Sequence, residues 1–313
     1  MSTVEKAAEM LKASQPGLTP LEPAPPEPSA STPVEAVPVH TAPSIERLQD
    51  RAHPASQTAA PASSAWHVDR KALERAGLLP LGLEANGRLV DEMRRIKRPL
   101  MANAFGKGVQ GLAHAERIVV TSAVSAEGKS FTALNLAMSL ACEPDFEVLL
   151  VDGDVPKSHL THVLGLQKHP GLMDVLANEQ LAPAEVIVRT DVPNLLVVPS
   201  GKRHPLTSEL FGSLRMEYVL QEFGGRDSRR LVLFDSSPLL ATSESQVLVS
   251  HMGQVVMVIA AGHTARHAVD QALQAMDESQ YVGLMLNMSR LPASESYYDS
   301  YYGQSSGRLA GEV

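Results

Sequence analysis

A glycine, a lysine and a serine stand together in the middle of the chain, directly after a short apolar run and a turn. The apolar run covers residues 118–121, and the three residues are Gly128, Lys129 and Ser130. The backbone N–H groups of such a turn, together with the N-terminus of a following helix, bind a phosphate group. A lysine at this place reaches the β- and γ-phosphates of a nucleotide, and the serine hydroxyl ligates Mg²⁺. The segment therefore predicts a nucleotide phosphate loop.

The match to the pattern G-x-x-x-x-G-K-[ST] is incomplete, because Ala123 stands at the first glycine position. The pattern alone is then of moderate specificity, and a strand–turn–helix with a chance Gly-Lys-Ser run is the structural alternative. The strand before it and the helix after it support the phosphate loop, because the motif requires both. We expect these residues of the loop to contact the nucleotide: Ser125, Ala126, Glu127, Gly128, Lys129, Ser130 and Phe131.

Carboxylates end two other apolar runs. Asp152 and Asp154 follow residues 148–151, and Asp235 follows residues 231–234. Carboxylates at the C-terminal ends of parallel strands lie in the ligand crevice of an α/β sheet. Because Mg²⁺ prefers oxygen ligands, we expect Ser130 and Asp235 to support a magnesium ion. Of Asp152 and Asp154, one could approach the metal and the other the nucleophile. The alternative for each aspartate is a cap of the following turn or helix.

The elements that must position these residues alternate between apolar strands and helical patterns. The predicted strands are residues 117–122, 148–152, 195–199, 231–235, 254–260 and 283–287. The predicted helices are residues 69–76, 86–105, 129–142, 172–177, 208–223, 243–250 and 264–278. Fully apolar strands separated by helices indicate an α/β fold, a mostly parallel sheet covered by helices on both faces.

The composition of the 313 residues excludes several classes of protein. A single cysteine, Cys142, excludes a disulfide framework and a cysteine-based zinc site. A net charge of −8 argues against non-specific binding of nucleic acid. Apolar runs such as residues 255–261 are far shorter than the ~20 residues that span a bilayer. We expect a cytoplasmic protein without a membrane span or a signal peptide.

The two ends of the chain differ from the middle. Residues 1–65 hold eleven of the 22 prolines and are predicted to be disordered, with a docking peptide as the alternative. Residues 66–292 are the predicted catalytic domain, whose residues 66–110 form N-terminal helices. Residues 293–313 are a predicted flexible tail, and they hold four of the six tyrosines: Tyr297, Tyr298, Tyr301 and Tyr302.

These motifs, in this order, resemble the bacterial tyrosine kinases, the P-loop autokinases of capsule and exopolysaccharide export, and most of all the exosortase-associated cytoplasmic autokinases. Residues 122–130 resemble the family's Walker A motif, residues 148–154 its Walker A′ motif, and residues 231–238 its Walker B motif. Glu92, Arg95 and Arg98 match its self-association motif, with a solvated basic face or an anionic lipid contact as alternatives. The tyrosine cluster resembles its autophosphorylated tail.

The resemblance implies a role for each matched position. Lys129 would handle the phosphates, Asp152 would orient or deprotonate the tyrosine hydroxyl, and Asn287 would contact the nucleotide base. Asp154 would support the metal. The resemblance implies ATP and Mg²⁺ as cofactors, a ring-shaped homo-oligomer, and phosphorylation of the tail in trans. It also implies an activating membrane polysaccharide co-polymerase, a cognate tyrosine phosphatase, and recruitment to the inner face of the cytoplasmic membrane.

The chain departs from the family at two places. Ser125 and Ala126 replace Pro-Gly in the loop, and Pro156 leaves Lys157 as the nearest cation after Asp154. Two alternatives therefore stay open. One is a MinD/ParA-like positioning ATPase, although such proteins carry a lysine where this chain has Val124. The other is a nucleotide-binding scaffold that transfers nothing.

Overall fold

The computed structural model describes residues 65–79, 83–225 and 229–289. The described part contains a seven-stranded sheet of order β3-β4-β2-β5-β1-β6-β7, in which only the short edge strand β3 runs antiparallel to its neighbour. The strands are β1 (Arg117–Ser122), β2 (Glu147–Asp152), β3 (Val188–Arg189), β4 (Leu195–Val198), β5 (Arg230–Asp235), β6 (Gln254–Ala260) and β7 (Tyr281–Asn287). The prediction of a mostly parallel sheet is confirmed.

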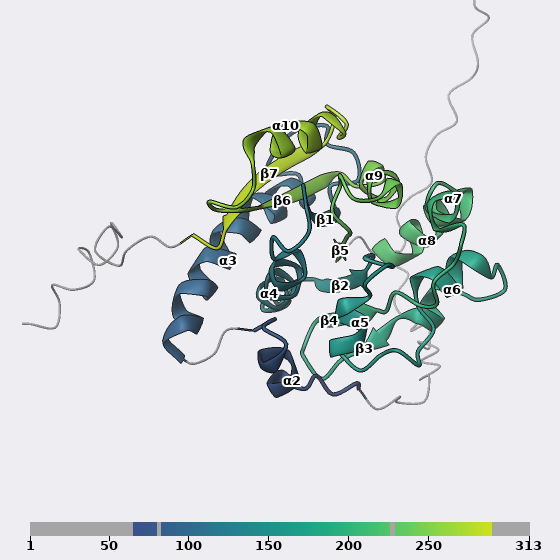
Figure 1. Ribbon diagram of the computed structural model, residues 1–313. Helices are drawn as coiled ribbons and strands as arrows, with labels where there is room; N and C mark the ends of the chain where they lie inside the picture. Colours follow the sequence, from purple (N-terminus) through teal and green to yellow (C-terminus); the bar gives the residue numbers. More distant parts are fainter. Residues whose placement is uncertain (1–64, 80–82, 226–228, 290–313) are drawn as a thin grey trace, which may run out of the picture. The chain divides into compact units, whose positions relative to one another are not determined.

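Helices cover both faces of the sheet, as predicted (Figure 1). One face carries α2 (Arg70–Arg75), α3 (Leu83–Ala104), α4 (Lys129–Ala141) and α5 (His159–Val163). The other carries α6 (Leu172–Ala177), the 3₁₀ turn η1 (Pro183–Val186), α7 (Thr207–Phe211), α8 (Leu214–Gly224), α9 (Ser243–Ser250) and α10 (Arg266–Gln274).

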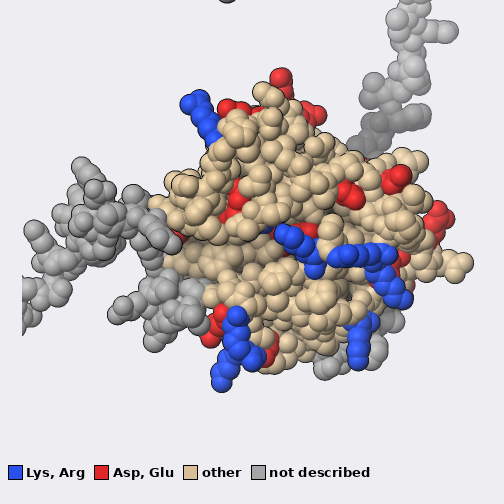
Figure 2. Space-filling model, viewed as in Figure 1, with Lys and Arg blue, Asp and Glu red and all other residues tan. Residues whose placement is uncertain are grey.

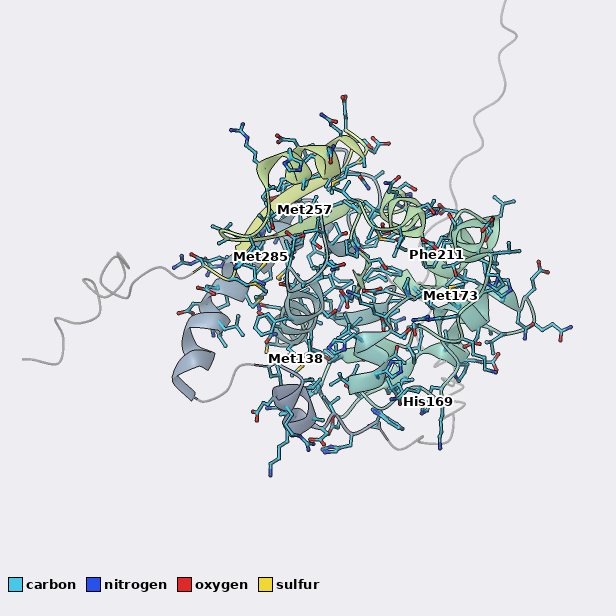
Figure 3. All side chains as sticks on the ribbon, in the orientation of Figure 1. Met138, His169, Met173, Phe211, Met257 and Met285 are labelled. Atoms are coloured by element: carbon cyan, nitrogen blue, oxygen red, sulfur yellow. The ribbon has the colours of Figure 1, made fainter. Side chains whose placement is uncertain are left out.

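The alternation of side chains along each strand divides the core into two layers. In β1, Val119 packs with α7, α8 and α9, whereas Ile118 and Val120 pack with α3 and α4. Figure 3 shows Met173 of α6 and Phe211 of α7 together, and Met138 of α4 on the other side of the sheet. Because both faces are covered, the central strands are apolar throughout, which is the pattern that the sequence shows.

Two predicted helices differ from the structure, and other elements were not predicted. The predicted helix 208–223 is two helices, because the Ser213 side chain caps α8 by accepting from the N–H of Met216 at 3.2 Å. The predicted helix 264–278 begins later, at Arg266, since the Thr264 hydroxyl donates to the carboxylate of Glu127. The strand β3 and the helix α5 were not predicted.

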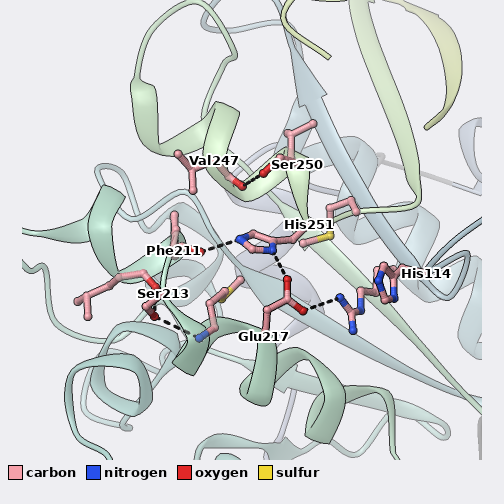
Figure 4. Close-up of polar contacts among 12 residues, drawn as sticks. His114, Phe211, Ser213, Glu217, Val247, Ser250 and His251 are labelled. Carbon is pink, nitrogen blue, oxygen red and sulfur yellow. Dashed lines mark hydrogen bonds and ion pairs between the residues drawn. The ribbon is translucent and has the colours of Figure 1, made fainter. Parts of the chain in front are cut away.

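A buried arginine joins β1 to the helices at the edge of the sheet opposite the phosphate loop. Arg117 is only 3% exposed, and its guanidinium lies 3.6 Å from the Glu217 carboxylate of α8. His251 lies between Glu217 and the carbonyl oxygen of Phe211, at 2.7 Å from each (Figure 4). The neighbouring positive charges lower the pKa of Glu217 although burial opposes them. Glu217 thus stabilises the packing of α8 and α9 against β1.

Replacing Glu217 by glutamine should lower the free energy of unfolding by about 1 kcal/mol, because the buried guanidinium of Arg117 loses one of its two counter-charges while the side-chain shape is kept; the other, Glu116 at 3.4 Å, remains. Urea denaturation measures the change. Glu222→Gln, on the exposed side of the same helix, is the matched control and should change stability by less than about 0.5 kcal/mol. Equal losses in the two variants would show that the Arg117 contact stabilises nothing.

Candidate active site

The segment from Ser122 to Ser130 forms a loop between β1 and the N-terminus of α4. Gly128 takes a φ of +93° and caps α4, and a Cβ atom there would lie 2.1 Å from Nδ2 of Asn287. Only glycine fits this backbone and this close approach. The first N–H groups of the 13-residue helix α4 are therefore directed at the space in front of the loop, which is the arrangement that binds phosphate.

A cavity of about 720 Å³ opens at this loop. The lining residues are Gly77, Leu78, Ala126, Gly128, Lys129, Ser130, Phe131, Asp154, Lys157, His159, Asn287 and Met288. The structure therefore brings seven of the predicted site residues to one cavity. It also places there Gly77 and Leu78, which lie about 50 residues earlier in the chain and which no motif indicated.

Leu78 reaches the cavity because the segment after α2 is held against α4. Asp69 caps the start of α2 by accepting from the N–H of Ala72, and Gly77, with a φ of +69°, ends it as predicted. The side chain of Asn135 in α4 then donates to the carbonyl oxygen of Leu78 at 2.9 Å. The N-terminal segment thus forms one wall of the cavity.

Glu127 holds the phosphate loop from inside the protein. It is 1% exposed, and its carboxylate accepts from the N–H of Val124 at 2.8 Å and from the hydroxyl of Thr264. Its carbonyl oxygen accepts from Nδ2 of Asn287 at 2.8 Å. Glu127 therefore does not line the cavity, although it was predicted to contact the nucleotide, and Asn287 uses one N–H to fix the loop. A contact of Asn287 with a nucleotide base stays a prediction.

Ala126 has a left-handed backbone within the loop, with a φ of +66°. A residue with a Cβ atom is disfavoured in this region. The family that the sequence resembles has glycine at this position. Ser125, the other replaced residue, is exposed and does not line the cavity. The loop of this chain therefore keeps its shape at a local conformational cost.

Replacing Ala126 by glycine should raise the melting temperature by roughly 1–4 °C, because relief of the left-handed backbone exceeds the extra entropy that glycine brings to the unfolded chain. Ala123→Gly is the matched control: Ala123 is fully buried and has no positive φ, so its loss of a methyl group should lower the melting temperature. A lower melting temperature for Ala126→Gly would mean that its backbone carries no strain.

Two buried aspartates lie side by side behind the cavity. In the register of the parallel strands β2 and β5, Asp152 stands opposite Asp235. Both oxygens of Asp235 and Oδ1 of Asp152 are buried without a hydrogen-bond partner in the described part of the chain. Oδ2 of Asp152 accepts from the N–H and the hydroxyl of Thr161 at 2.8 and 2.6 Å. Neither aspartate is among the residues that line the cavity.

Burial raises the pKa of both aspartates. For Asp152 it raises the pKa to about 6, against the opposing hydrogen bonds from Thr161. For Asp235 burial and the nearby Asp152 raise the pKa well above its usual value, and Ser130 and Lys129 oppose this only in part. Buried carboxylates with unpartnered oxygens are costly without a cation, so this pair favours a positive ligand.

Lys129 lies among these carboxylates at the start of α4. Burial lowers the pKa of its ammonium group, and the charges of Asp235 and Asp154 raise it in turn. Asp154 is 3% exposed, lines the cavity, and accepts from the Ser237 hydroxyl at 2.7 Å. The site thus combines one buried cation with three carboxylates from two neighbouring strands.

The donor set fits Mg²⁺. The free oxygens of Asp235, the Asp154 carboxylate and the Ser130 hydroxyl are oxygen ligands next to a phosphate-binding loop. Residues 65–79, 83–225 and 229–289 contain no group of three or more His, Cys, Asp or Glu side chains arranged to hold a metal. Magnesium takes one or two carboxylates in protein sites and completes its shell with water and phosphate.

The predicted self-association motif lies on α3. Glu92, Arg95 and Arg98 are exposed, and their contact with a neighbouring subunit stays a prediction. Lys97 lies in the same basic segment of the sequence, but the structure buries it. Its ammonium group lies 2.6 Å from Glu143 and donates to the carbonyl oxygen of Ser139 at 2.7 Å. It fastens α3 to α4 and is not part of the basic surface.

Other predictions fall on residues that the structure does not describe. The proline-rich residues 1–64 and the tyrosine tail 293–313 lie outside the described ranges. Within those ranges, no helix is both long and apolar enough to cross a membrane.

The chain is similar to known proteins over this domain. The model of the family described as AAA domain matches residues 115–286. Tyrosine-protein kinase YwqD of Bacillus subtilis is 30% identical over 188 residues, which are 59% of this chain and 77% of that protein. Tyrosine-protein kinase CpsD of Streptococcus agalactiae is 29% identical over 210 residues, which are 64% of this chain and 88% of that protein.

Solved structures agree with this relationship. The kinase domain of Escherichia coli tyrosine kinase ETK has 26% identity and a TM-score of 0.52, over 58% of this chain and 70% of that one. The BceF tyrosine kinase domain has 25% identity and a TM-score of 0.51, over 71% of this chain and 99% of that one. With its phosphate loop, its acidic strand ends and these relatives, the chain belongs to the bacterial protein-tyrosine kinases, a family of P-loop enzymes built on an AAA domain.

Proposed function

We propose that this chain is a Mg²⁺- and ATP-dependent tyrosine autokinase whose substrate is its own tail, at Tyr297, Tyr298, Tyr301 and Tyr302. The supporting observation is the cavity in which Lys129, Ser130 and Asp154 meet, with unpartnered oxygens of Asp235 and Asp152 behind them. Lys129 would bind the β- and γ-phosphates, and Ser130, Asp154 and Asp235 would hold Mg²⁺. Magnesium supplies charge stabilisation for the transferred phosphoryl group.

Asp152 is the residue that we assign to the tyrosine hydroxyl. A carboxylate with a pKa of about 6 is largely ionised at neutral pH and still basic enough to take part in proton transfer. Its Oδ2 is held by Thr161, which leaves Oδ1 available. In this arrangement Thr161 orients the carboxylate and Lys129 stabilises the charge that develops on the phosphoryl group.

The setting of the reaction follows from the family resemblance. The kinase would form a homo-oligomeric ring through Glu92, Arg95 and Arg98, and each subunit would phosphorylate the tail of a neighbour. It would regulate the chain length and export of an exopolysaccharide at the inner face of the cytoplasmic membrane. A membrane polysaccharide co-polymerase would activate it, and a tyrosine phosphatase would reverse the modification.

Two altered chains test the transfer and its direction. One, the tail-silent enzyme, carries Tyr→Phe at all four tail positions; the other, the acceptor chain, carries Lys129→Met and keeps its tail. After mixing with Mg²⁺-ATP, intact-mass measurement should show up to four added phosphates on the acceptor chain. ATP hydrolysis without any phosphotyrosine in the unaltered protein would favour a positioning ATPase instead. Nucleotide binding with neither reaction would favour a scaffold.

A further inference from the structure

Three cations without a counter-charge lie at the C-terminal edge of the sheet. Lys157 follows β2, and Lys202 and Arg203 follow β4. All three side chains are exposed, and none has an ion pair or a hydrogen bond within the described ranges. Because β2 and β4 are neighbouring parallel strands, their following loops emerge at the same edge. Figure 2 shows lysine and arginine side chains in a row across the middle of this view.

The loop that carries Lys202 and Arg203 is fixed at both ends. The N–H of Ser200 donates to the hydroxyl of Thr161 at 2.9 Å, and that hydroxyl donates to Asp152. At the other end, the hydroxyl of Thr207 donates to the carbonyl oxygen of His204 at 2.6 Å. One threonine therefore separates the loop from a catalytic carboxylate, and the loop presents its two cations beside the active site.

Lys202 and Arg203 differ from the cations that hold the fold together. Lys97 and Arg230 are paired with Glu143 and Glu147 at 2.6 and 2.7 Å. His204, in the same loop, accepts from the N–H of Leu206 through Nδ1 at 3.1 Å. The formal positive charges of the loop are those of Lys202 and Arg203. Unpaired cations on a chain of net charge −8 create a local positive potential, which attracts an anionic ligand.

Lys157 and the pair after β4 have different places in this surface. Lys157 lines the nucleotide cavity, and its charge contributes to the lowered pKa of Lys129, so it belongs to the phosphate end of the site. Lys202 and Arg203 do not line the cavity. Their loop follows β4 and binds Thr161, which in turn binds Asp152, the carboxylate that we assign to the acceptor hydroxyl.

We propose that Lys202 and Arg203 form a docking surface for the anionic tyrosine segment, residues 295–302, of a second copy of this chain. This rests on the proposed function. The segment carries Glu295 and Asp299, and the sequence has no lysine or arginine between Arg290 and Arg308. Each phosphate adds about −1.5 to −2 charge, so a tail that is phosphorylated once binds more strongly and presents its next tyrosine. The surface thus selects tyrosines flanked by negative charge.

Charge reversal of the two residues tests the proposal. The tail-silent enzyme is made with and without Lys202→Glu and Arg203→Glu, and the initial rate is measured against the concentration of the acceptor chain. Reversal should raise the KM for the acceptor chain roughly tenfold at low ionic strength, an effect that added salt reduces. The kcat and the KM for ATP should stay within about twofold, because neither residue touches the nucleotide cavity.

A matched pair controls for net charge. Lys107→Glu and Arg229→Glu also reverse one lysine and one arginine that are exposed, at the opposite edge of the sheet. This pair should change the KM for the acceptor chain by less than about twofold, because its charges lie farther than a Debye length from the site. Equal increases in both pairs, or none in the first, would overturn the docking surface.

A binding measurement separates this proposal from the kinase reaction. A fluorescent peptide of residues 290–313 should bind the nucleotide-loaded, full-length tail-silent enzyme more weakly after reversal of Lys202 and Arg203, and a phosphorylated peptide should show the larger loss. If the unaltered chains transfer no phosphate, the proposed function is wrong. The binding of the peptide still shows whether Lys202 and Arg203 form the docking surface. If reversal weakens binding to phosphatidylglycerol vesicles but not to the peptide, the surface is a lipid site and the proposal is wrong.

Discussion

Replacing Lys129 by methionine should abolish detectable tyrosine phosphorylation, with a loss of at least roughly 10²-fold in rate. Lys129 is the one buried cation of the described site, it lines the cavity, and it lies within the field of Asp154 and Asp235. Phosphoryl transfer depends on positioning and on charge stabilisation, and a single preorganised donor in a site closed to water contributes roughly 10²–10³. Methionine keeps most of the unbranched side chain and removes its terminal ammonium group, with its charge and donors.

Phosphotyrosine after incubation with Mg²⁺-ATP, quantified by intact mass, measures this loss. Lys71→Met, an exposed lysine of α2, is the control and should retain full activity. A melting temperature near that of the unaltered protein should accompany the loss, which separates a catalytic defect from unfolding. Retained phosphotyrosine in Lys129→Met would move the catalytic site away from this loop.

Replacing Asp235 by asparagine should abolish phosphoryl transfer and stabilise the metal-free protein by about 1–3 kcal/mol. Both oxygens of Asp235 are buried without partners, and Asp152 stands opposite it in the neighbouring strand. Asparagine removes the buried charge and its repulsion with Asp152, so the fold gains stability as it loses a magnesium ligand. Asp145→Asn, an exposed residue without a side-chain partner, is the control and should change neither quantity.

The gain in stability from Asp235→Asn should increase as the pH rises. The pKa of Asp152 is raised from 3.8 to about 6, so between these values the folded protein keeps a proton that the unfolded chain has lost. The stability that this group contributes is therefore complete below pH ~4 and decreases as the pH rises to about 6, by roughly 3 kcal/mol. The pKa of Asp235 is raised as well, so its effect has the same sign.

Thermal melts in EDTA between pH 4 and pH 8 measure this dependence. The difference in melting temperature between Asp235→Asn and the unaltered protein should grow as the pH rises through 6. Added Mg²⁺ should then stabilise the unaltered protein more at pH 7.5 than at pH 5, because only ionised carboxylates bind the ion. A difference that stays constant over this range would contradict a raised pKa for the buried pair.

Features that depend on neighbouring residues of the chain were predictable from the sequence. The β1 strand, the loop up to Ser130 and the helix α4 are contiguous, so the local order of apolar residues, glycine and lysine determined their arrangement. The strand-terminal positions of Asp152 and Asp235 followed in the same way. The parallel direction of the strands then placed both carboxylates at one edge of the sheet.

Features that depend on distant residues were decided only by tertiary structure. Composition places Lys97 among the basic residues of the segment 88–98, whereas packing of α3 on α4 buries it beside Glu143. The hydroxyl of Thr264 binds Glu127, which is 137 residues away, and the register of two strands sets Asp152 against Asp235.

The reason is physical. Burial and register arise when separate elements pack together, and no local pattern records which partner an element will meet. The sequence by itself determined which chemical groups this kinase carries and on which strands and loops they lie. The tertiary structure decided which of them are buried together, and thus the raised pKa of Asp152 and Asp235.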